Sequence, residues 1–107
     1  MKFYDFSNYE YYALIGVSER EMFPMDVALE AYIEEVAEID EEEKGILPKE
    51  ISKEQALEIY KKAVIEGCET EEEKIEQFKK EIDLNNKLRI RYYDNRYVLL
   101  LIDGSLL

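Results

Sequence analysis

Near its end the chain reads Lys87-Leu-Arg-Ile-Arg-Tyr-Tyr93, then Asp94-Asn95, then Arg96-Tyr-Val-Leu-Leu-Leu-Ile102. The first run alternates, because leucine, isoleucine and tyrosine take every second position between lysine and arginines, as in a half-buried strand. Asp and Asn tolerate the left-handed backbone that tight turns need. The second run is apolar throughout, which is typical of a strand covered on both faces. The stretch therefore predicts a C-terminal β-hairpin with a buried second strand.

A further strand is predicted over Tyr9–Val17, which is rich in tyrosine and branched aliphatic residues. We expect it to pair beside Tyr97–Ile102, and Gly16 near its end permits a bulge or a close backbone approach. Lys2–Phe6 is short and aromatic, and Ser7-Asn8 after it is typical of a turn. The expected sheet is three-stranded and mainly antiparallel, built from this N-terminal strand and the C-terminal hairpin.

Three helices are predicted between these strands, and we expect them to cover one face of the sheet. The first begins at Pro24, where a missing N–H costs nothing, and continues to about Ile39. A charged linker over 40–50 follows it. Capping boxes that begin at Ser52 and Thr70 start helices running to about Glu66 and Ile82. The chain is thus expected to form one α+β domain spanning residues 1–107.

Composition narrows the possible functions. Cys68 is the sole cysteine, so no intramolecular disulfide is possible, and a reducing cytoplasm is the expected setting. No apolar run approaches the ~20 residues of a membrane span, so no membrane association is expected. The net charge of −12 repels nucleic acid and attracts basic protein surfaces.

Catalytic chemistry finds little support in the residue types present. The chain has no histidine, which removes the commonest general base and the usual zinc ligand. Cys68 lies beside acidic neighbours, which disfavour a reactive thiolate. The run Asp40-Glu-Glu-Glu43 lacks the ligand spacing of a calcium loop and fits a solvated charge run better. We expect no catalytic residue, no metal site and no cofactor, and the protein is not expected to be an enzyme.

Acidic side chains are concentrated in the middle of the chain. Residues 18–86 carry twenty-two acidic and nine basic groups. The acids gather in two groups, one within Glu30–Glu43 and one within Glu66–Glu76. If the helices pack side by side, the two groups would form one broad negative face that binds a basic protein surface. Solubility is the simpler explanation for any one glutamate. The predicted partner-binding residues are Glu30, Glu34, Glu35, Glu38, Asp40, Glu41, Glu42, Glu43, Glu69, Glu71, Glu72, Glu73 and Glu76.

An alternative binding surface is offered by the predicted hairpin, whose basic residues are interleaved with Tyr92, Tyr93 and Tyr97. Such a stripe has the ingredients of a platform for single-stranded nucleic acid. Four charges are few beside the acidic middle of the chain, however, so direct nucleic-acid binding is the second hypothesis. Its residues are Lys87, Arg89, Arg91, Arg96 and Tyr93.

Three stretches, Asp5–Ile15, Ala28–Ala37 and Ile51–Ala56, resemble small proteins of phages and mobile elements of Gram-positive bacteria. Some small acidic proteins from that setting are anti-CRISPR inhibitors of Cas9. The resemblance implies a non-enzymatic inhibitor that acts in the bacterial cytoplasm on a host nucleic-acid-handling protein, with a Cas9-type nuclease as the leading case. A structural subunit that oligomerises through an open sheet edge is a third possibility.

Overall fold

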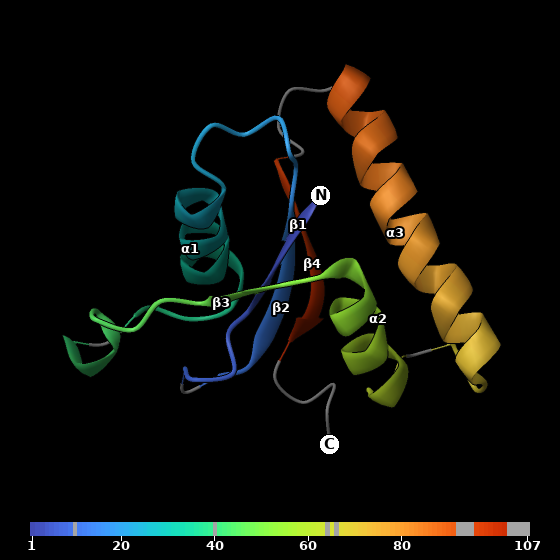
Figure 1. Ribbon diagram of the computed structural model, residues 1–107, viewed down its shortest axis with the longest axis horizontal. Helices are drawn as coiled ribbons and strands as arrows, with labels where there is room; N and C mark the ends of the chain where they lie inside the picture. The colour runs from blue at the N-terminus through green and yellow to red at the C-terminus, as the bar shows by residue number, and fades with distance from the viewer. Residues whose placement is uncertain (10, 40, 64, 66, 92–95, 103–107) are drawn as a thin grey trace.

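The computed structural model describes residues 1–9, 11–39, 41–63, 65, 67–91 and 96–102, with the side chains of 42 and 84–91 excepted. Figure 1 shows a sheet with helices on both sides of it. The elements in chain order are β1 (Lys2–Asp5), β2 (Ala13–Val17), α1 (Pro24–Glu35), η1 (Glu41–Glu43), β3 (Lys49–Ile51), α2 (Lys53–Lys62), α3 (Glu71–Arg91) and β4 (Tyr97–Ile102).

The sheet has four antiparallel strands in the order β3-β1-β2-β4, so the prediction of three strands is wrong. Of the described part of the predicted strand Tyr9–Val17, only Ala13–Val17 is a strand. Residues 9, 11 and 12 are not in a strand, and the Phe6 N–H donates to the Ala13 carbonyl. β1 and β3 were missed. Four and three residues respectively are too short to show a clear period of two.

The predicted hairpin is also wrong in its first half. α3 continues through Arg91, and residues 92–95, which include the expected turn, lie outside the described residues. Leu, Lys and Arg are strong helix formers, and neither Pro nor Gly occurs between Thr70 and Arg91 to end the helix. Helix propensity therefore prevails over a short alternating pattern. The second half is confirmed as a strand, β4, which pairs with β2. Its expected burial is confirmed only in part, because β4 is last in the strand order and only Leu100 and Leu101 in it are buried.

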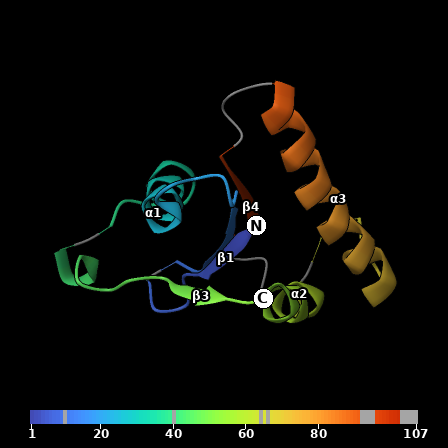
Figure 2. The ribbon, with the colours of Figure 1, turned by 45° about the horizontal axis from the view of Figure 1, so that its top comes forward.

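The helices cover both faces of the sheet, whereas the sequence suggested one. Side chains of β2 alternate: Leu14 belongs to the core beneath α2 and α3, and Ile15 to the core beneath α1. Figures 1 and 2 show α1 on one side of the strands, with α2 and α3 on the other. The domain therefore has two hydrophobic cores that share β1, β2 and β4.

Beneath α1, three aromatic rings pack together. The ring of Phe6 stacks on that of Tyr32 with centroids 4.7 Å apart, and Tyr9 contacts both rings at 5.1 and 5.0 Å. The Tyr32 hydroxyl donates to the Tyr11 carbonyl, and the Tyr9 hydroxyl donates to the Ile46 carbonyl. The first bond fixes the loop before β2 to α1, and the second joins that loop to the segment before β3, so both part-buried hydroxyls are satisfied.

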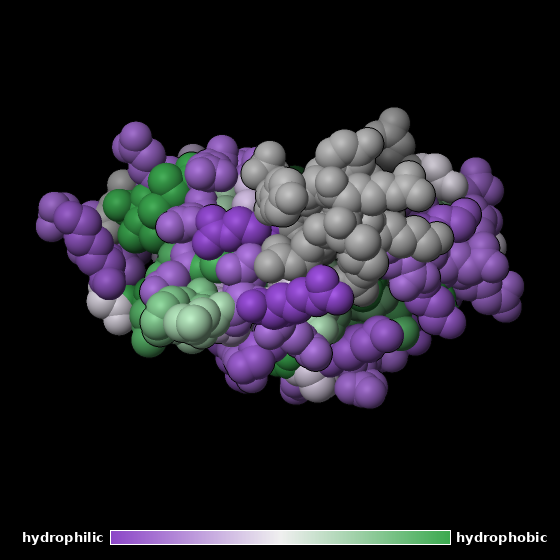
Figure 3. All heavy atoms as spheres, turned by 90° about the horizontal axis from the view of Figure 1, so that it is seen from above, coloured by the Kyte–Doolittle hydropathy of each residue, from purple (hydrophilic) through white to green (hydrophobic). Residues whose placement is uncertain are grey.

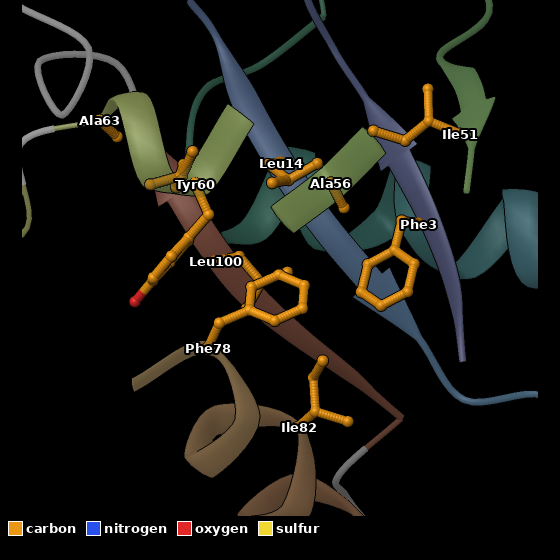
Figure 4. Packing of buried hydrophobic residues seen from close by; sticks show 10 residues of the cluster. Phe3, Leu14, Ile51, Ala56, Tyr60, Ala63, Phe78, Ile82 and Leu100 are labelled. Atoms are coloured by element: carbon orange, nitrogen blue, oxygen red, sulfur yellow. The ribbon is translucent and has the colours of Figure 1, made fainter. Parts of the chain in front are cut away.

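Beneath α2 and α3, the rings of Phe3, Tyr60 and Phe78 form the second core (Figure 4). α2 begins with the predicted capping box, in which Ser52 accepts from the Gln55 N–H and the Gln55 side chain accepts from the Ser52 N–H. The helix ends at Lys62, four residues earlier than predicted, and α1 ends at Glu35, before the expected Ile39.

Candidate protein-binding surface

The solvent side of α1 carries the first of the two acidic groups. Val27, Ala28, Ala31 and Tyr32 face the core and Met25 and Leu29 are half-buried beside them, so the glutamates on the other side of the helix point to water. Five of the predicted glutamates are exposed here, along α1, just after it and at the start of η1. This α1 acidic surface consists of Glu30, Glu34, Glu35, Glu38 and Glu41.

Arg96 and Tyr97 attach the α1 acidic surface to the start of β4. The Arg96 guanidinium lies 3.3 Å from a carboxylate oxygen of Glu30 and 3.4 Å from one of Glu21. The Tyr97 hydroxyl lies 3.1 Å from a carboxylate oxygen of Glu35 and 3.3 Å from one of Glu34. Burial, followed by the hydrogen bond and charge of Glu35, raises the pKa of Tyr97 to about 12. The contacts hold these carboxylates in place at the surface.

The remaining acids of this stretch differ in their placement. Glu43 is only 8% exposed, so it is not available to a partner as the sequence suggested. Its charge adds to burial in raising the pKa of Tyr9. Asp40 and the side chain of Glu42 lie outside the described residues.

The second acidic group lies at the start of α3, where all five glutamates are exposed. Thr70 accepts from the Glu73 N–H, and the Glu73 carboxylate accepts from the Glu69 N–H, so part of this group caps the helix. We call Glu69, Glu71, Glu72, Glu73 and Glu76 the α3 acidic surface. Because α1 and α3 cover opposite faces of the sheet (Figure 1), the two surfaces do not form the single broad face that side-by-side helices would give.

The alternative nucleic-acid platform is not formed as a strand. Lys87, Arg89 and Arg91 belong to α3, and their side chains, like Tyr93 as a whole, lie outside the described residues. Arg96 is paired with two glutamates and is thus not free for a phosphate. The sequence did not identify the partners of Arg96, because Glu30 lies 66 residues away along the chain and Glu21 lies in the loop before α1.

Among the residues that the structure describes, no three His, Cys, Asp or Glu side chains come together as metal ligands. In the same part of the chain, no helix has the length and apolar character needed to cross a bilayer. Cys68 is a partly buried free thiol between α2 and α3. The arrangement on the α1 side is suited to electrostatic recognition of a basic surface.

Comparison with known proteins adds one finding. Residues 1–100 match the family model described as the YosH C-terminal domain. No curated protein and no solved structure is detectably similar to the chain.

Proposed function

The chain belongs to the YosH C-terminal domain family, and from that premise and the distribution of its exposed acidic side chains we propose that it is a non-enzymatic module that binds a basic protein surface. The α1 acidic surface is the binding side. The observation that supports the proposal is the set of five exposed carboxylates over α1 and η1, two of which are positioned by Tyr97 and one by Arg96. Carboxylates held in this way lose little side-chain entropy when a basic partner binds.

The partner we propose is a host nucleic-acid-handling protein, whose Lys/Arg groove presents the complementary charge. A net charge of −12 favours fast encounter with such a groove and competes there with nucleic acid. The resemblance to small proteins of phages and mobile elements makes a Cas9-type nuclease the specific case, with the domain acting as an anti-CRISPR inhibitor in the bacterial cytoplasm.

The test is a competition assay with a purified Cas9 from a Gram-positive bacterium. Wild-type protein is expected to weaken guide-RNA or DNA binding, and the effect should shrink as salt rises, because exposed charges are screened. A variant with Glu34, Glu35, Glu38 and Glu41 replaced by Gln should inhibit at least about tenfold less, which corresponds to ~1.4 kcal/mol.

The matched control replaces four α3 glutamates, Glu69, Glu71, Glu72 and Glu76, by Gln, and it changes the net charge equally. The control should inhibit like the wild type. If the two variants lose inhibition equally, net charge rather than the α1 acidic surface is responsible. Absence of inhibition by the wild-type protein in molar excess would remove this nuclease as the partner.

A further inference from the structure

An apolar groove lies along the end of α1 that is nearer to η1. Its walls are Leu29 and Ile33 of α1 on one side and Ile46 and Leu47 of the segment before β3 on the other, and it encloses about 440 Å³. This volume falls within the ~300–1,000 Å³ typical of ligand pockets. Figure 3 shows green hydrophobic side chains gathered among purple hydrophilic ones at the end of the molecule that holds α1 and η1.

The groove is firmly built at its base and open at its edges. Tyr9, which is 7% exposed, also lines it, and its hydroxyl donates to the Ile46 carbonyl while its ring packs on Tyr32 of α1, 5.0 Å away between centroids. Ile33 and Leu47 are 48% and 60% exposed, although both are large aliphatic side chains. Their burial by a partner would be favourable at about 25 cal/mol per Å².

The charge around the groove is negative. Glu38 and Glu43 line it, and its single lysine, Lys44, is bound to Glu41 at 3.0 Å. The α1 acidic surface continues directly from this edge along the helix. A ligand that fits must therefore offer apolar side chains at its centre and positive charge around them.

We propose that this groove receives the apolar side chains of a basic amphipathic helix of the partner protein. The inference rests on the proposed function and specifies the partner segment. Ile46 and Leu47, which form one wall, are not in a strand, so the groove offers no strand edge there to pair with an extended peptide. Side chains must therefore anchor the ligand, and a helix presents them at i, i+3 and i+4 with lysine or arginine on the flanks.

The test uses two synthetic peptides as probes. One is an amphipathic peptide of leucine and lysine with leucines at helical spacing, and the other has the same lysines with serine in place of leucine. Fluorescence anisotropy measures their binding to wild-type protein and to Ile33→Ser, Leu47→Ser and the double variant. Met22→Ser is the matched control, because Met22 is an 82% exposed apolar residue outside the groove.

We expect the leucine-lysine peptide to bind about tenfold more weakly to the double variant and unchanged to Met22→Ser. Part of its binding should survive ~1 M salt, where the Debye length is ~3 Å. Leu47→Ser alone should weaken binding without loss of the circular dichroism signal, because Leu47 lies in a non-helical segment. This single variant therefore tests the groove even if the double variant does not fold.

Equal binding of the leucine-lysine peptide to the wild type and Leu47→Ser would overturn the inference. So would a wild-type dimer in sedimentation that becomes a monomer in the Leu47→Ser variant, because the occupant would then be a second copy. The lysine-serine peptide distinguishes failure of the groove from failure of the proposed function. If replacing Glu34, Glu35, Glu38 and Glu41 by Gln does not weaken binding of this peptide, the proposed function fails. The groove variants should leave its binding unchanged.

Discussion

The two sides of the sheet are both acidic, yet they differ in what accompanies the charge. On the α1 side, carboxylates are positioned by Arg96 and Tyr97 and adjoin an apolar groove. On the other side, the α3 acidic surface surrounds a helix start, and no large apolar side chain of the described part of α2 and α3 is mostly exposed. Charge alone is explained by solubility and capping. Charge beside exposed aliphatic side chains is the arrangement on which the proposed binding surface rests.

The largest expected effect tests whether the two sides stabilise one cooperative unit. Phe6→Ala on the α1 side and Phe78→Ala on the other each remove a fully buried ring, so each should lower the free energy of unfolding by ~3–5 kcal/mol. Both cores share β1, β2 and β4, so each variant should unfold in a single transition in urea, followed by circular dichroism. Two transitions in either variant would show that the sides unfold independently.

A smaller effect compares the loops that precede β3 and α3. Gly67 has φ +82°, a left-handed conformation that an L side chain strains, whereas Gly45 has no such angle and open space around it. Gly67→Ala should therefore lower the free energy of unfolding by ~1 kcal/mol. Gly45→Ala should leave it unchanged or slightly raised, since alanine restricts the unfolded chain. Equal losses in thermal unfolding would contradict the backbone argument.

The last comparison concerns the free energy of unfolding in alkali. At neutral pH its effect is the smallest of the three. Folding raises the pKa of Tyr97 on the α1 side and of Tyr60 on the other to about 12, in both cases chiefly by burial. A raised tyrosine pKa contributes stability that is complete below the ordinary value of 10 and is lost as pH rises toward 12.

Tyr97→Phe and Tyr60→Phe should accordingly each make the free energy of unfolding fall less steeply with pH between about 10 and 12. Urea midpoints measured at several pH values check this. A steeper fall in either variant would contradict the assigned direction of the pKa shift.

Local signals in the sequence predicted much of the fold. Pro24 at the first position of α1, the reciprocal bonds of Ser52 and Gln55, and the cap at Thr70 are all confirmed, because each depends on residues within one helical turn. The apolar run over Tyr97–Ile102 is also confirmed as a strand, β4, which is contacted from α1 and from α3 although it lies last in the strand order.

The features that the sequence did not predict depend on contacts between residues far apart along the chain. β3 pairs with β1 across more than 40 residues, and nothing in Lys49-Glu50-Ile51 distinguishes it from the surrounding linker. The acidic residues were identified correctly as mostly exposed, but their division between two sides follows from the alternation of β2 and β1 beneath different helices. The groove joins α1 to residues 46–47, so neither segment alone predicts it.

The most direct test of the α1 side as the binding surface is an NMR titration of ¹⁵N-labelled protein with the leucine-lysine peptide. Both sides of the sheet are acidic, so attraction by charge alone would shift amides of α1 and α3 alike. We predict that the largest shifts fall on the amides of Leu29–Glu35 and of residues 41–47, with Glu71–Ile82 nearly unchanged. Equal shifts on both sides, or shifts confined to α3, would contradict the account.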